Sequence, residues 1–274
     1  MIHIRIADRL FEFPSGWDEL TSEDILFFSH KMVIREPVST IKPALTLKIL
    51  NLKVLRKDSE TDGELEYFYV KDSQGKVFRI SVYALQLVSE KLDFMFAEKT
   101  LKEGNKQWYV HSRLTKNPVP ELRVGKTVFY GPKQALSDIS FHRFILSEHY
   151  YSLLVKSGDP VYLDKILGVL YIEDGESFSE DKWLLNHAHF KSVSQVEKYA
   201  IRLYYEGSRN FLSEKFPYVF GGKKSSRNSV VDGFMKIVNA LSGNDVTKHD
   251  QIRASPLYEV LYCLNDLIEK NEKL

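Results

Sequence analysis

The sequence contains a single cysteine, Cys263, among its 274 residues. One cysteine excludes a disulfide within the chain and is typical of proteins from a reducing compartment. Because the neighbours of Cys263 on a predicted final helix are apolar, we interpret it as a buried structural thiol and not as a nucleophile.

Long apolar runs are also absent, since no window approaches the roughly 18 apolar residues that a membrane-spanning helix needs. The opening segment MIHIRIADRLFEF alternates apolar and charged residues, so no signal peptide is predicted. The 38 basic and 37 acidic residues nearly cancel. This balance argues against bulk binding to nucleic acid or membrane surfaces, though not against a local patch. We therefore expect a soluble, intracellular protein.

The common catalytic motifs are missing, including G-x-S-x-G and G-x-G-x-x-G. His142 and His149 fall on one predicted helix, but seven residues correspond to a rise of about 10.5 Å, too long for one metal site. His187 and His189 could share a strand face, yet they lack a spaced third ligand. The sequence therefore predicts no catalytic residue, no metal site and no cofactor.

A glycine-rich basic segment, GGKKSSR at 221–227, superficially resembles a phosphate-binding loop. A P-loop would need glycine at the position that Pro217 occupies. One interpretation is a basic connector. The other is a local contact with phosphate or nucleic acid through Lys223, Lys224 and Arg227.

The first part of the chain predicts hairpins and helices. A strand pair is expected over 2–13 and a hairpin over 65–80, with Gly75 at a positive φ. Thr21 and Asp24 fit a capping box for a helix that ends before Pro37. Residues 43–55 fit both a helical and an alternating pattern, and we favour helix. A helix is expected over 82–97, followed by strands within 107–130.

The later part predicts helices throughout. Residues 136–171 read as two helices joined at 157–160, with Ser137 as N-cap and Gly158 ending the first helix. We expect the helix from about 193 to pack against this pair, with Gly207 permitting a close helix crossing. Further helices are expected over 228–241 and from Ser255 onward.

Gly131-Pro132 is the strongest candidate domain boundary. We therefore predict an α+β, predominantly helical protein. Residues 1–131 would form an α+β domain with short β-hairpins and helices, and residues 132–274 a C-terminal helical bundle.

Charges are segregated between residues 42 and 66. Basic residues come first and acidic residues follow: Lys42, Lys48, Lys53, Arg56 and Lys57, then Asp58, Glu60, Asp62, Glu64 and Glu66. A solvated helix end meeting a polar loop explains this pattern. Two complementary binding surfaces would explain it as well.

Tyrosines concentrate in the predicted helical part: Tyr150, Tyr151, Tyr162, Tyr171, Tyr199, Tyr204, Tyr205 and Tyr218. A tyrosine ring can be buried while its hydroxyl stays wet, which suits protein interfaces. Filling of the core is the other interpretation.

Four segments resemble, in order, blocks of uncharacterised proteins encoded in phage and prophage tail regions. They are PSGWDELT (14–21), LTKNPVPEL (114–122), FYGPKQALSDISFHRF (129–144) and YYEGSRNFLSEKFPYVF (204–220). The resemblance implies a structural or tail-assembly protein, acting as an assembly chaperone or adaptor. It carries no catalytic motif.

Three functional hypotheses follow. The first is a non-enzymatic protein that binds other proteins of a phage tail or injection module, in the host cytoplasm or incorporated into a particle. The second is an enzyme whose site assembles from scattered residues such as His142, Glu148 and His187. The third is a nucleic-acid-binding accessory protein that uses 221–227. The candidate partner-binding residues are Trp17, Tyr150, Tyr151, Tyr204, Tyr205, Lys223, Lys224 and Arg227.

Overall fold

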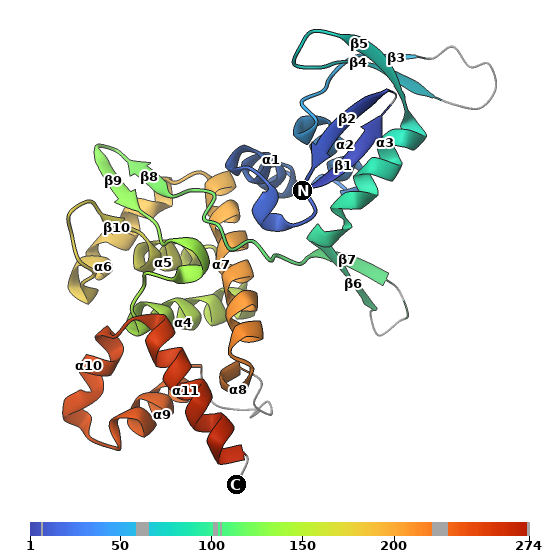
Figure 1. Cartoon of the computed structure of the whole chain (residues 1–274). Helices are drawn as coiled ribbons and strands as arrows, with labels where there is room; N and C mark the ends of the chain where they lie inside the picture. The colour runs from blue at the N-terminus through green and yellow to red at the C-terminus, as the bar shows by residue number, and fades with distance from the viewer. Residues whose placement is uncertain (7, 59–65, 101–103, 105, 221–229, 273–274) are drawn as a thin grey trace. The chain divides into compact units, whose positions relative to one another are not determined.

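The chain divides into two compact units, Met1–Arg113 and Leu114–Leu274. The computed structural model describes residues 1–6, 8–58, 66–100, 104, 106–220 and 230–272 (Figure 1). The boundary predicted at residue 131 falls inside the second unit. The predicted fold class is confirmed: the protein is α+β and predominantly helical, with short antiparallel hairpins first and helices after them.

The strands of the first unit form three small antiparallel sheets, ordered β1-β2, β3-β4-β5 and β6-β7. Their bounds are β1 Ile2–Ile6, β2 Arg9–Phe13, β3 Lys53–Asp58, β4 Tyr67–Lys71, β5 Val77–Ser81, β6 Phe96–Thr100 and β7 Lys106–Val110. The hairpins predicted over 2–13 and 65–80 are both present. Gly75 has φ +84° in the β4–β5 turn, a backbone conformation that glycine adopts without strain.

The helices of this unit are α1 Ser22–Val33, α2 Val38–Ile49 and α3 Val82–Ser89, with 3-10 turns η1 Trp17–Glu19 and η2 Glu90–Met95. The predicted capping box is confirmed at the start of α1. Thr21 Oγ1 accepts from the Asp24 backbone N–H at 3.2 Å, and the Asp24 carboxylate accepts from the Thr21 N–H at 3.1 Å.

Two predicted helices are corrected. The helix favoured over 43–55 begins earlier, at Val38, and gives way to β3 at Lys53 because that segment pairs with β4. The helix expected over 82–97 ends at Ser89, and its last residues turn through η2 into β6, which pairs with β7. In both cases strand pairing outweighs a local helical pattern.

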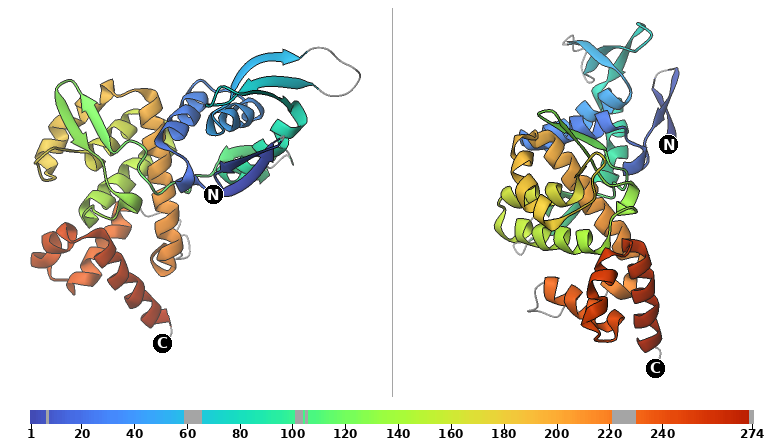
Figure 2. Two further views of the ribbon diagram at one scale, coloured as in Figure 1. Left: turned by 45° about the horizontal axis from the view of Figure 1, so that its top comes forward. Right: turned by 90° about the vertical axis from the view of Figure 1, so that its left-hand side faces the viewer.

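The second unit consists mostly of helices. They are α4 Phe141–Ser157, α5 Val161–Leu170, α6 Glu180–Asn186, α7 Gln195–Lys215, α8 Pro217–Phe220, α9 Val230–Ser242, α10 His249–Ala254 and α11 Leu257–Glu272, with 3-10 turns η3 Gln134–Leu136, η4 His187–Ser192 and η5 Val246–Lys248. Figure 2 shows α9, α10 and α11 gathered beside α4.

This unit is not wholly helical. Its sheet is β8 Glu121–Val124, β9 Thr127–Tyr130 and β10 Ile172–Glu173, in the order β10-β9-β8. Tyr130 pairs with Ile172, so the hairpin that precedes the predicted boundary is bound to a strand among the helices. That pairing explains why 114–131 belongs to the second unit.

The α4–α5 pair is the predicted helical hairpin. Ser140, not Ser137, caps α4, and Gly158 ends it with φ +70°. The buried guanidinium of Arg143 on α4 donates to the carbonyl oxygens of Val169 and Leu170 at 2.9 and 2.6 Å, which satisfies the last turn of α5.

Helix α7 packs against this pair, as predicted. The Tyr205 hydroxyl donates to Glu148 Oε1 at 2.7 Å, and Lys198 forms a buried ion pair with Asp164 at 2.6 Å. Among the described residues, none of these helices combines the length and apolar character that crossing a bilayer requires.

Candidate protein-binding pocket

The first unit contains an open apolar pocket of about 740 Å³, which we call the α2–α3 pocket. The helical spacing of its residues shows that each helix contributes one face: positions 38, 39, 42 and 43 of α2, and positions 82, 85, 86 and 89 of α3. Phe68, Glu90, Asp93 and Trp108 complete the lining.

The floor of the pocket is buried and its polar atoms are bonded. Leu85 is buried, and Ser89 Oγ donates to its carbonyl oxygen at 2.6 Å. Thr46 Oγ1 donates in turn to Ser89 Oγ at 3.1 Å. The hydroxyls of Thr46 and Ser89 are therefore already bonded within the protein, and Leu85 adds apolar surface to this floor.

Trp108 and a charged pair form the rim. The indole of Trp108 is 49% exposed although it lines the pocket. Lys42 Nζ lies 2.5 Å from Asp93 Oδ1 and 5.3 Å from the centroid of the Trp108 ring. The ammonium group of Lys42 thus attracts the π face of the indole and orients the ring. About half of the indole remains open to solvent.

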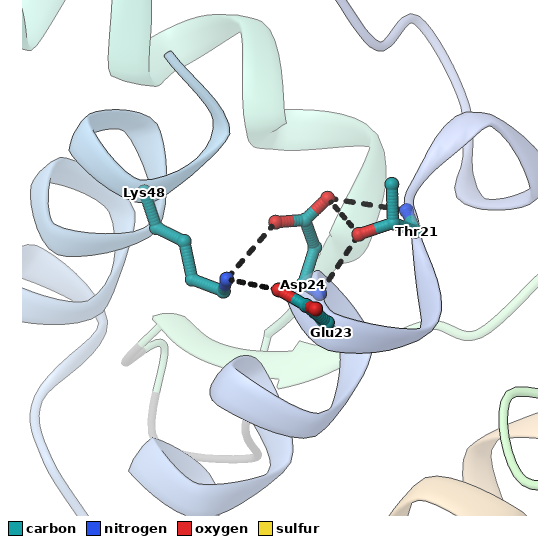
Figure 3. Close-up of polar contacts among 4 residues, drawn as sticks. All are labelled: Thr21, Glu23, Asp24 and Lys48. Atoms are coloured by element: carbon teal, nitrogen blue, oxygen red, sulfur yellow. Dashed lines mark hydrogen bonds and ion pairs between the residues drawn. The ribbon is translucent and has the colours of Figure 1, made fainter. Parts of the chain in front are cut away.

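A second lysine anchors α2 to α1. Lys48 Nζ lies 3.4 Å from Glu23 Oε2 and 4.0 Å from Asp24 Oδ1, the residue that also closes the capping box (Figure 3). Both acids belong to the first turn of α1, where negative charge is favourable. The α2 wall of the pocket is therefore held by the same residues that begin α1.

The surface of this pocket suits the binding of apolar side chains. Two small helices and a half-exposed tryptophan present more apolar than polar surface, with Lys42 and Asp93 already neutralising each other. Large apolar side chains elsewhere on this unit are also exposed: Leu10, Ile34, Leu55, Tyr83, Leu87 and Tyr109. Exposed apolar surface rimmed by polar groups is typical of protein interaction sites.

The candidate residue Trp17 lies in the core and not on a binding surface. Its ring is 3% exposed and meets Phe28 and Phe94 edge to face, at 5.9 and 6.4 Å between centroids. The indole N–H donates to the His111 carbonyl oxygen at 3.0 Å. Burial removes Trp17 from direct contact with a partner.

Tyr204 and Tyr205 are likewise core residues, both at most 1% exposed. The Tyr204 hydroxyl donates to the Lys133 carbonyl oxygen at 2.6 Å. Tyr205 shares the Glu148 carboxylate with Arg209, whose Nη2 lies 2.9 Å from Oε2. Filling of the core therefore explains these two tyrosines.

Tyr150 and Tyr151 are only partly buried and remain accessible. The centroid of the Tyr150 ring lies 5.3 Å from that of Trp183. Lys165 Nζ lies 5.2 Å from the Tyr150 centroid. Burial, followed by the nearby Glu206 carboxylate, raises the pKa of Tyr151 to about 12. Its hydroxyl donates to Glu206 Oε1 at 3.1 Å.

The residues of the scattered-site hypothesis have separate partners. His142 Nε2 lies 2.8 Å from Glu180 Oε1, whereas Glu148 pairs with Arg209, and His187 packs beside the Trp183 ring at 6.1 Å. His187 and His189 lie in η4, so the strand face expected for them does not exist. Within the described ranges, no group of three His, Cys, Asp or Glu side chains could hold a metal ion.

The candidate residues Lys223, Lys224 and Arg227 lie outside the described residues.

Cys263 is exposed on α11, which corrects the prediction of a buried thiol. The buried positions of α11 are Leu257, Val260, Leu261 and Leu264, and residue 263 falls off that stripe.

Sequence reasoning missed Trp108, the most exposed aromatic of the pocket. The available signal was the pair Trp108-Tyr109 in one short strand. Because neighbouring strand residues point to opposite faces, the two large rings cannot both be buried on the same side of that strand.

Comparison with family models, curated proteins and solved structures finds no match to this chain.

Proposed function

We propose that this chain is a non-enzymatic protein of a phage tail or contractile-injection module. It binds other proteins of that module as an assembly chaperone or structural adaptor. Its place of action is the cytoplasm of the host bacterium, with incorporation into a phage or phage-like particle as a later step. The tail-region origin rests on the resemblance of four sequence segments.

The observation that supports protein binding is the α2–α3 pocket with Trp108 on its rim. Tryptophan is enriched among residues that dominate binding energy, and such residues lie in apolar pockets surrounded by polar groups. The pocket volume of about 740 Å³ accommodates several apolar side chains of a partner. The occupant we propose is an apolar segment of a neighbouring tail protein.

Co-expression with the products of neighbouring tail genes tests this function. We expect affinity-tagged full-length protein to retain one of them through purification and to elute with it in size-exclusion chromatography. A protein that elutes as an unaccompanied monomer in every co-expression would contradict the proposal.

A further inference from the structure

One face of the β3-β4-β5 sheet is basic. Residues paired directly across an antiparallel sheet point to the same side, and side chains alternate along each strand. The pairings Arg56↔Tyr69↔Arg79 and Lys53↔Lys71 therefore place two arginines and two lysines on one face. We call Lys53, Arg56, Tyr67, Tyr69, Lys71 and Arg79 the basic face.

The opposite face of the sheet is partly buried, along β4 and β5. Val70 and Ile80 are 0% and 2% exposed, and the Phe78 ring lies 6.5 Å from Phe11 of the β1-β2 hairpin. All four cations of the basic face are exposed, in contrast. Core residues of the sheet such as Val70 and Ile80 thus lie on the side opposite the basic face.

The arginines are held in place by tyrosine rings. Arg56 Cζ lies 4.3 Å from the centroid of Tyr69, and Arg79 Cζ lies 4.2 Å from that of Tyr67. Arg79 is also 5.8 Å from the Tyr69 centroid. A guanidinium stacked on a ring keeps its N–H edge available, so both groups are preorganised for bidentate bonds to an anion.

The lysines are arranged unfavourably for an isolated sheet. Lys53 and Lys71 are directly opposite each other, and like charges in that position destabilise a sheet. Within the described part of the sheet, one acid lies on this face: Asp58, 3.7 Å from Arg79. The described strand residues of this face therefore carry four positive charges and one negative charge, and a bound anionic group would relieve the repulsion between the cations.

We propose that the basic face binds an acidic segment of a partner protein, as a second contact in addition to that at the α2–α3 pocket. This inference rests on the proposed function, because it takes the partner to be a protein. Carboxylates fit guanidinium edges, which can donate two parallel hydrogen bonds to them. Nucleic acid fits less well, since the guanidiniums cover tyrosine faces on which bases would stack.

Fluorescence anisotropy of the full-length protein with a labelled oligo-glutamate peptide tests the proposal, with a labelled oligo-thymidine of equal charge as the competing probe. We expect the peptide to bind in a salt-dependent manner and more tightly than the oligonucleotide. Arg56→Gln/Arg79→Gln should weaken peptide binding by about tenfold, because charge-assisted hydrogen bonds to carboxylates are lost. Arg56→Lys/Arg79→Lys keeps the charge and should recover only part of the affinity.

The matched control is Lys91→Gln/Lys99→Gln, which removes two exposed cations of the same unit away from the sheet. It should leave peptide binding unchanged. Equal losses in both double variants, no peptide binding, or tighter binding of the oligonucleotide would each overturn the inference. Thermal melting of every variant identifies any loss of fold. If the peptide fails to bind while co-expression still captures a tail protein, only this inference fails.

Discussion

Gly207, in the middle of α7, lies directly against the backbone of Leu114. A Cβ atom at position 207 would be 2.3 Å from the Leu114 carbonyl oxygen and 2.4 Å from its nitrogen. The sequence predicted a close helix crossing at this glycine. The close neighbour is instead the extended segment that begins the second unit.

Gly207→Ala should therefore destabilise the second unit, although alanine is the better helix former by about 1 kcal/mol. Backbone atoms cannot yield cheaply, so we expect a net loss of about 1–3 kcal/mol in the free energy of unfolding. Denaturant melts measure it, with the exposed α7 change Gln195→Ala as control. A stabilised Gly207→Ala variant would show that no close approach exists.

Trp17→Ala should lower the stability of the first unit by about 3–5 kcal/mol, because it removes a buried ring. The His111 carbonyl would also lose its indole donor. The exposed Trp108→Ala serves as control and should cost less than about 1 kcal/mol. Similar losses for the two tryptophan variants would contradict the burial of Trp17.

Alkaline pH should destabilise the second unit. Burial raises the pKa of Tyr151, Tyr199 and Tyr258 to about 12 and raises that of Tyr171 and Tyr205 further. In the unfolded chain a tyrosine ionises near pH 10, so above about pH 10 the unfolded state loses protons that the folded state keeps. The stability present below that pH is then lost as pH rises through the folded pKa values.

Denaturant melts between about pH 9 and pH 11 measure this effect, and tyrosinate absorbance should rise together with unfolding. Full ionisation of these tyrosines near pH 10 in a folded protein would contradict it.

Cys263 should react in the folded protein. Because it is exposed on α11, we expect one equivalent of iodoacetamide to label it without denaturant. Mass spectrometry measures the extent, with a denatured sample as the reference for complete labelling. Labelling that requires denaturant would restore the original prediction of a buried thiol.

Local chemistry made some of the fold predictable. The capping box of Thr21 and Asp24 and the turn at Gly158 depend on neighbouring residues, and both are present. The 43–55 segment carried two superimposed patterns, and pairing of β3 with β4 divided it. That pairing joins residues on either side of 59–65 in the sequence, so no local pattern could decide it.

The α2–α3 pocket was not predictable in the same way. Its lining comes from α2, β4, α3, η2 and β7, which come together only in the folded unit. The tyrosine-rich helices suggested an interface, but the structure places Tyr204 and Tyr205 in the core. The charge segregation between 42 and 66 pointed toward this unit, and strand pairing places Lys53 and Arg56 of that segment on the basic face.

We propose that the α2–α3 pocket binds a partner protein, and isothermal titration of a partner captured by co-expression against two variants can decide this. Trp108 and Tyr109 are neighbours in β7, 49% and 47% exposed, and they point to opposite faces. Trp108→Ser should weaken binding by at least about tenfold, whereas Tyr109→Ser should change it by less than about threefold. Equal affinities for the two variants would contradict the claim.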